Sequence, residues 1–120
     1  MAKILIIDDE EILRQLMEHV LSGDGHETIT AEDGVAGIVL AKSDAPDLII
    51  SDMSMPKMTG WDMVKALKAD PTTKDIPIIA LTAHATADDR AAAFDAGIST
   101  YEEKPLDMAR LKKHIAELIG

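Results

Sequence analysis

Short, unbroken aliphatic runs recur along this 120-residue sequence, and they constrain its fold more than any other feature. Residues 4–7, 48–50 and 76–81 form three such runs, built from Ile, Leu, Ala and one Pro. Runs of this length suit strands that are buried on both faces, as in a parallel sheet. Residues 27–31 alternate in polarity and predict a less buried strand, and the more polar residues 98–103 predict a strand at the sheet edge.

Helical patterns fill the intervals between these runs. The first helix has acidic residues at its start, where the helix dipole favours anions, and Gly23 just beyond its end. Further helices are expected over Gly34–Lys42, Gly60–Lys68 and Ala87–Ala96, and a last one follows Asp107 as its N-cap. The predicted core-facing stripe of the first helix is broad and consists of Ile12, Leu16 and Val20 beside Leu13, Met17 and Leu21.

Strands and helices therefore alternate strictly, with five of each. Right-handed crossovers between parallel strands turn such a chain into an open, doubly wound α/β sheet with helices on both faces. No internal repeat, low-complexity segment or linker interrupts the pattern, so residues 1–120 are expected to form one domain.

Composition excludes several classes of function. The sequence has 22 acidic and 12 basic residues, and its net charge of −10 repels nucleic acid and anionic membranes. It has no apolar stretch of the roughly 20 residues that span a bilayer, no signal-peptide pattern and no Cys for disulfides or thiolate metal sites. We therefore expect a cytoplasmic, monomeric protein whose partners are neither nucleic acid nor membrane.

Polar residues end four of the five predicted strands. Asp8 and Asp9 follow the first, Asp52 the third, Thr82 the fourth and Lys104 the fifth. In doubly wound folds ligands bind beyond the carboxyl ends of the strands, at the point where the strand order reverses. Three carboxylates, a hydroxyl and an ammonium group are therefore expected to meet at one rim of the sheet.

This set of groups indicates phosphoryl transfer. Clustered carboxylates repel one another unless a cation lies between them, and oxygen ligands without His or Cys suit Mg²⁺. Lys104 and Thr82 are suited to hold phosphoryl oxygens, one as a charge and one as a hydroxyl donor. A carboxylate nucleophile, a divalent ion and a Lys together can position and neutralise a phosphoryl group in transfer.

Four segments carry a resemblance to a known family. In order and spacing they resemble the phosphoacceptor receiver domain of bacterial two-component response regulators, in particular the single-domain regulators of chemotaxis. The segments are Ile7-Asp8-Asp9-Glu10, Ser51–Pro56 with Gly60, Thr82-Ala83 and Tyr101–Pro105. The resemblance covers essentially the whole chain and implies a flavodoxin-like sheet with strand order 2-1-3-4-5.

The resemblance also implies a role for each residue of the acidic group. Asp52 is the implied phosphoacceptor, which takes the phosphoryl group from a phosphohistidine of a sensor histidine kinase or a histidine phosphotransfer protein. Asp9 is implied to bind Mg²⁺ directly, with Asp8 acting mainly through water. The backbone carbonyl of Ser54 completes the implied metal site.

The remaining implied roles concern the phosphoryl group and the switch. The Thr82 hydroxyl is implied to bind the phosphoryl group together with the backbone N–H groups of Ala83 and Met53. Lys104 is implied to pair with a phosphoryl oxygen, and the peptide bond between Lys104 and Pro105 is implied to be cis. Tyr101 is implied to turn inward as Thr82 moves, so that a downstream protein reads the face of helix four, strand five and helix five. The resemblance further implies that Ser54 and His84 flank the path of the attacking water and tune dephosphorylation.

Three alternatives remain at this point. A phosphatase of the haloacid-dehalogenase type expects Asp-x-Asp at the first strand, whereas the order here is Asp8-Asp9-Glu10. A flavodoxin-like binder of nucleotide or flavin expects a first loop rich in Gly, Ser and Thr, not in acidic residues. The third is a receiver-like binding module that works without phosphorylation. The other histidines, His19, His26 and His114, are expected to face solvent.

Overall fold

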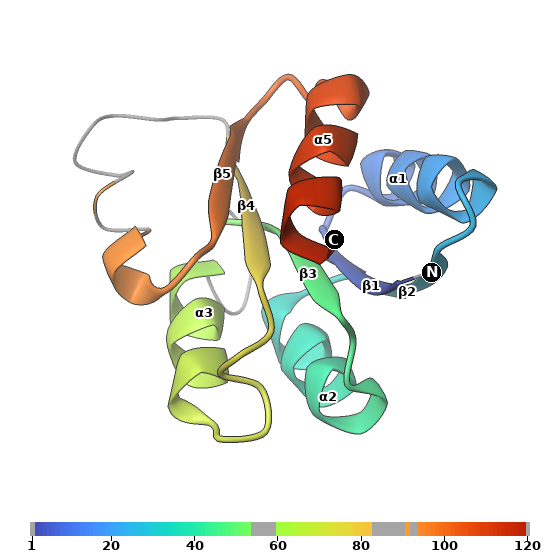
Figure 1. Ribbon diagram of the computed structural model, residues 1–120. Helices are drawn as coiled ribbons and strands as arrows, with labels where there is room; N and C mark the ends of the chain where they lie inside the picture. The colour runs from blue at the N-terminus through green and yellow to red at the C-terminus, as the bar shows by residue number, and fades with distance from the viewer. Residues whose placement is uncertain (1, 54–59, 83–90, 92–93, 120) are drawn as a thin grey trace.

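The computed structural model describes residues 2–53, 60–82, 91 and 94–119. Five strands and four helices lie wholly within these ranges (Figure 1). The strands are β1 (Lys3–Ile7), β2 (Glu27–Ala31), β3 (Leu48–Asp52), β4 (Ile78–Thr82) and β5 (Thr100–Glu103). The helices are α1 (Glu11–Gly23), α2 (Gly34–Asp44), α3 (Gly60–Ala69) and α5 (Met108–Ile119). Of the expected fourth helix, residues 91 and 94–96 are described, and they are helical.

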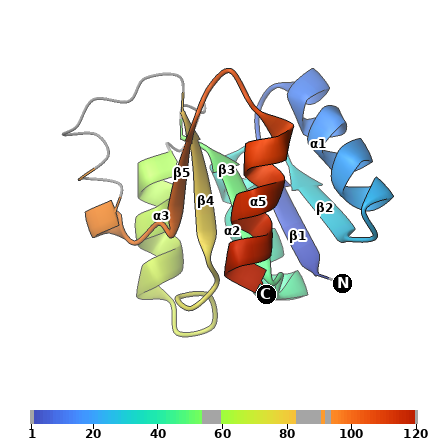
Figure 2. The ribbon, with the colours of Figure 1, turned by 45° about the horizontal axis from the view of Figure 1, so that its top comes forward.

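The five strands form one parallel sheet in the order β2-β1-β3-β4-β5. Helices α1 and α5 cover one face, and α2 and α3 cover the other (Figure 2). The strand order reverses between β1 and β3, because the chain adds β2 on one side of β1 and the later strands on the other. The expected fold class, a doubly wound five-stranded sheet of order 2-1-3-4-5 with five helices, is confirmed.

Alternate residues of each central strand supply the two halves of the core. On β1, Ile4 and Ile6 pack toward α1 and α5, whereas Leu5 and Ile7 pack toward α2 and α3. All four side chains are fully buried, as are Leu48, Ile49 and Ile50 on β3. Burial of both faces explains why Ile4–Ile7 and Leu48–Ile50 read as unbroken apolar runs, because none of these side chains meets water.

The apolar stripe of α1 is narrower than the sequence predicted. Met17 and Leu21 are buried, but Ile12 and Leu16 are 83% and 46% exposed, so their expected place in the core was wrong. At about 100° per residue, Ile12 lies about 140° around the helix from Met17 and Leu16 about 100°. Among the described elements only the sheet and α5 flank this helix, so a sector this far from Met17 remains in solvent.

Local signals set the ends of the helices. Asp33 caps α2 by accepting a hydrogen bond from the Ala36 N–H at 2.8 Å. The helix continues two residues past its expected end and stops at Ala45, whose φ of 46° is left-handed. The Asp107 carboxylate accepts the Arg110 N–H at 3.2 Å, as expected of an N-cap.

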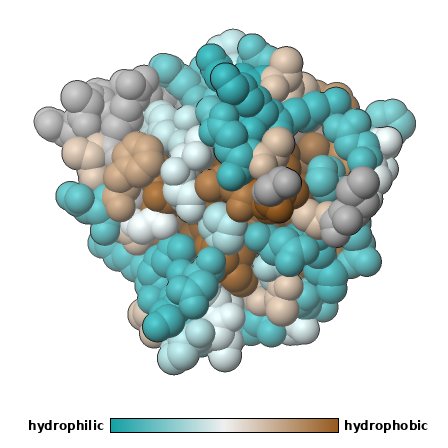
Figure 3. Space-filling view, in the orientation of Figure 1, coloured by the Kyte–Doolittle hydropathy of each residue, from teal (hydrophilic) through white to brown (hydrophobic). Residues whose placement is uncertain are grey.

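The exterior accords with the acidic composition. Hydrophilic residues cover most of the face drawn in Figure 3, and apolar residues show through between them. Within the described residues, no helix has both the length and the apolar character that a bilayer crossing requires.

Candidate functional site

Three carboxylates meet at the carboxyl ends of β1 and β3. Asp8 and Asp9 follow β1, Asp52 ends β3, and each offers an oxygen within 4.8 Å of the others. Parallel pairing of the two strands, with Ile7 opposite Ser51, brings Asp8 beside Asp52. Asp8 and Asp52 are buried, whereas Asp9 is exposed. The cluster therefore has two carboxylates inside the rim of the sheet and one at its mouth.

Three hydrogen bonds hold Asp8 in place, and they leave one oxygen of its carboxylate without a donor among the described residues. Its backbone N–H donates to the Ala31 carbonyl at 3.1 Å, and its Oδ1 accepts the Glu10 N–H at 2.8 Å. Its backbone carbonyl accepts a hydrogen bond from Arg14 Nη1 at 2.7 Å. In the described part of the chain its Oδ2 is buried without a hydrogen-bond donor. A buried oxygen without a donor is what a bound cation would satisfy.

Burial is the main reason that the pKa of Asp8 rises to about 6. The Glu10 N–H opposes this rise, and the negative charge of Asp52 adds to it. The carboxyl group thus stands close to its titration point near neutral pH, which is common where a fold prepares a site for an ion or a reaction.

Lys104 brings the ammonium group to this cluster. Its Nζ lies 3.3 Å from Asp52 Oδ2, and both side chains are largely buried. Burial alone would lower the pKa of Lys104, but the charges of Asp52 and Asp8 outweigh it and raise that pKa. The backbone N–H of Lys104 donates to the Thr82 carbonyl at 2.7 Å, and the bond to Pro105 is cis.

The other expected site residues are distributed around this centre. Thr82 ends β4 and is buried, and its strand neighbour in register is Glu103. Tyr101 lies on β5, partly buried against the core that faces α2 and α3. Ser54, Ala83 and His84 lie outside the described residues.

Two features were missed by sequence reasoning. The first is the hydrogen bond from Arg14 to the Asp8 carbonyl. It was missed because a lone Arg on a helix ordinarily indicates a solvent-facing position. The second is the carboxylate of Glu102, which is only 2% exposed and accepts from Arg110 Nε at 3.0 and 2.9 Å through its two oxygens. His114 Nδ1 lies 3.2 Å from the same carboxylate without a hydrogen bond, so its expected solvent-facing position was wrong.

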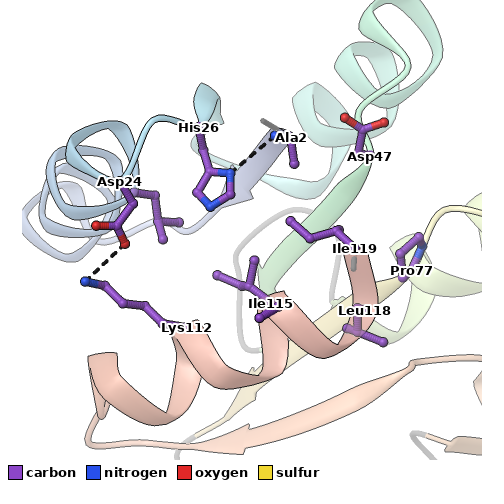
Figure 4. A pocket seen from close by; sticks show the side chains of 11 residues that line it. Ala2, Asp24, His26, Asp47, Pro77, Lys112, Ile115, Leu118 and Ile119 are labelled. Carbon is purple, nitrogen blue, oxygen red and sulfur yellow. Dashed lines mark hydrogen bonds and ion pairs between the residues drawn. The ribbon is translucent and has the colours of Figure 1, made fainter.

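One pocket lies at the opposite end of the sheet from the carboxylates (Figure 4). Its floor is apolar and includes Ile115 of α5. Two polar contacts border it: a Lys112–Asp24 ion pair at 3.1 Å and a hydrogen bond at 3.3 Å from the Ala2 N–H to His26 Nδ1. None of the site residues lines this pocket, so the candidate site rests on the acidic cluster.

Comparison with known proteins agrees with this geometry. The family model of the response regulator receiver domain matches residues 4–116. The chain belongs to this family. A receiver domain is a signalling module of two-component systems rather than a turnover enzyme, and receiver domains are phosphorylated by histidine kinases.

Two curated relatives differ in how much of their length this receiver covers. Response regulator PleD of Caulobacter vibrioides is 37% identical over 98% of this chain, which spans only 26% of PleD. The polar-differentiation response regulator DivK of Brucella anthropi is 32% identical, and the match covers 98% of this chain and 95% of DivK.

Solved structures show the same fold. The chemotaxis protein CheY4 of Vibrio cholerae is 34% identical with a TM-score of 0.93, and the match covers 98% of each chain. The receiver domain of the sensor histidine kinase PA1611 of Pseudomonas aeruginosa is 28% identical with a TM-score of 0.90, over 99% of this chain and 98% of that one. The PA1611 domain holds a magnesium ion in its active-site cleft. The acidic cluster of the present receiver is typical of such a magnesium site.

Proposed function

We propose that this receiver accepts a phosphoryl group on Asp52, from a phosphohistidine of a sensor histidine kinase or a histidine phosphotransfer protein, in a Mg²⁺-dependent reaction. The observation that carries the proposal is the meeting of three carboxylates within 4.8 Å, with the Lys104 ammonium 3.3 Å from Asp52. A nucleophilic carboxylate, an oxygen-rich cation site and a fixed ammonium group are what phosphoryl transfer requires.

The residues of the cluster fit Mg²⁺. Asp9 at the mouth would bind the ion directly, and the donor-free Oδ2 of Asp8 would face it directly or through water. The backbone carbonyl of Ser54 is proposed as a further ligand. When bound, the ion neutralises the negative charge that builds up on the phosphoryl oxygens during transfer.

The chain's own residues then perform the transfer. Asp52 is the nucleophile, and one of its oxygens forms a bond to phosphorus as the phosphorus–nitrogen bond to the donor histidine breaks. The Lys104 ammonium group lies 3.3 Å from Asp52 Oδ2 before the reaction, and it can move to a phosphoryl oxygen afterwards. Thr82, with the backbone N–H of Ala83, would hold the other phosphoryl oxygens. The Met53 N–H, which the sequence also suggested for this role, instead donates to the Leu81 carbonyl at 2.9 Å.

The signal would leave the site through the strands that carry these groups. Thr82 and Tyr101 lie on the adjacent strands β4 and β5, so a shift of the hydroxyl toward phosphate can draw the ring inward. A downstream protein would read the resulting change on the face of helix four, β5 and α5. Ser54 and His84 are proposed to tune hydrolysis of the acyl phosphate. We place the protein in the cytoplasm, where histidine kinases present their catalytic domains.

Phosphorylation-independent binding is the alternative, and one experiment separates the two. The protein is incubated with a small-molecule phosphodonor and Mg²⁺, and its intact mass is measured. We expect one added phosphoryl group in wild type and in Asp95→Ala, an exposed acidic residue away from the cluster, and none in Asp52→Ala. A folded wild type that takes up no phosphoryl group would overturn the proposal, as would equal uptake by Asp52→Ala.

A further inference from the structure

The Arg14 side chain points back from α1 to the loop that carries the metal-binding carboxylates. Its Nη1 donates to the backbone carbonyl of Asp8 at 2.7 Å, and the side chain is partly buried. We propose that Arg14 is a positioning residue, which sets the direction of the Asp9 carboxylate and thereby the affinity of the cluster for Mg²⁺. This inference rests on the Mg²⁺ site of the proposed function.

Asp9 depends on its backbone more than the other two carboxylates do. The carboxylate of Asp8 is held by the Glu10 N–H, and that of Asp52 by Lys104. The Asp9 side chain is exposed, and within the described residues its carboxylate makes no hydrogen bond or ion pair. Its orientation is therefore determined by the peptide groups on either side of it.

Arg14 holds the first of these peptide groups. The Asp8 carbonyl belongs to the planar unit that joins Asp8 to Asp9. A hydrogen bond to this oxygen restricts rotation about ψ of Asp8 and φ of Asp9, the two torsions that turn the Asp9 side chain toward or away from the cluster. The N–H of Asp8 is already bonded to Ala31, so the bond from Arg14 completes the fixing of the loop.

Geometry distinguishes this role from simple charge neutralisation. Burial raises the pKa of Asp8, and the cation whose charge opposes this rise is Lys104. Arg14 instead contacts a backbone oxygen, and residues that orient metal ligands in this indirect way typically change metal affinity by about 10- to 100-fold when removed. A partly exposed hydrogen bond of this kind is a small part of a fold whose core lies on the two faces of the sheet.

The test is the dissociation constant for Mg²⁺, measured by titration calorimetry on the full chain. We expect Arg14→Ala to weaken Mg²⁺ binding by about 10- to 100-fold, and Arg14→Lys to recover part of the loss because it keeps a donor. Lys112→Ala removes a cation that pairs with Asp24 at 3.1 Å, away from the cluster, and should leave the affinity unchanged. Equal affinities in wild type and Arg14→Ala would overturn the inference.

Salt dependence separates positioning from charge. Between about 0.1 and 1 M KCl the screening length falls from roughly 10 to 3 Å, so a purely electrostatic effect of Arg14 would shrink. We expect the ratio of Mg²⁺ affinities between wild type and Arg14→Ala to persist; a ratio that falls to one at high salt would contradict positioning. Arg14→Met keeps the length of the side chain without a donor, and it should show the same loss of Mg²⁺ affinity relative to wild type. It takes the place of Arg14→Ala in the comparison if the alanine variant folds poorly.

The outcome is independent of the proposed phosphorylation. If wild type binds Mg²⁺ and accepts a phosphoryl group while Arg14→Ala binds Mg²⁺ equally well, only the role of Arg14 is lost. If wild type binds Mg²⁺ but accepts no phosphoryl group, the proposed function fails while the calorimetric comparison still decides the role of Arg14. If wild type binds no Mg²⁺, the inference falls with the metal site itself.

Discussion

Replacing Asp8 by Asn should stabilise the protein at neutral pH when Mg²⁺ is absent. The Asp8 side chain is fully buried, and its Oδ2 lacks a hydrogen-bond donor within the described residues. Asn has the same shape and can still accept the Glu10 N–H through its oxygen, which Asp8 accepts at 2.8 Å. The substitution therefore removes a buried negative charge and keeps the contact that orders the loop.

The size of the effect follows from the shifted pKa. Burial raises the pKa of Asp8 from 3.8 to about 6, and each pKa unit corresponds to about 1.4 kcal/mol. Because the folded-state pKa is the higher one, the folded protein holds this proton more tightly than the unfolded chain. Stability from this group is full below about pH 4, falls as the pH rises through 4 to 6, and is lost above it. At pH 7 the ionised carboxylate thus costs on the order of 3 kcal/mol, which the Asn variant avoids.

Urea unfolding in a chelator, followed by far-UV circular dichroism at pH 4 and pH 7, measures this difference. We expect Asp8→Asn to be more stable by about 2–3 kcal/mol at pH 7 and nearly equal to wild type at pH 4. Asp9→Asn is the matched control, because Asp9 is exposed and solvent screens its repulsion, so its gain should stay below about 1 kcal/mol. A destabilised Asp8→Asn protein at pH 7, or a gap that does not change with pH, would refute the reasoning.

Three further substitutions test other parts of the structure. A Cβ on Gly60 would lie 2.6 Å from the Cα of Met53, so Gly60→Ala should lose about 1–3 kcal/mol in urea unfolding; an unchanged midpoint would show that Met53 moves aside without cost. Among the described residues, Arg110→Ala leaves the buried Glu102 with His114 alone beside it and should cost about 1–3 kcal/mol, much of it recovered by adding Glu102→Gln, as a double-mutant cycle would reveal. Lys104→Ala should lower the melting temperature in chelator and slow phosphoryl uptake followed by intact mass, and uptake at the wild-type rate would count against its role.

The rim of the site could be predicted because few physical rules determine it. Strands buried on both faces must be apolar along their length, so the first polar residue marks where each strand leaves the core. Parallel strands end on the same edge, and the reversal of strand order opens a crevice there. Asp8 and Asp52 follow from these rules alone, and the structure brings both into the cluster with Asp9.

Contacts between distant parts of the chain explain what the sequence did not reveal. The exposure of Ile12 depends on which side of α1 the sheet and α5 occupy, and periodicity alone does not specify it. Glu102 reads as a polar residue of an edge strand, yet α5 covers it and supplies Arg110 as its partner. The role of Arg14 rests on one hydrogen bond to a backbone oxygen, and no residue pattern encodes such a bond.

The acidic cluster sets stability against function in this fold. The buried charge that makes the ion-free protein less stable is the same charge that a cation would satisfy, so the two effects are linked through the same carboxylate. A ligand that binds only the folded state stabilises that state. Once the ligand concentration exceeds the dissociation constant, the gain grows with the logarithm of the ratio between the two. Saturating Mg²⁺ should therefore raise the unfolding midpoint of wild type toward that of ion-free Asp8→Asn, and leave the variant nearly unchanged. The site therefore destabilises the ion-free fold, because the sheet holds two carboxylates in a buried place where only a cation makes their charges favourable.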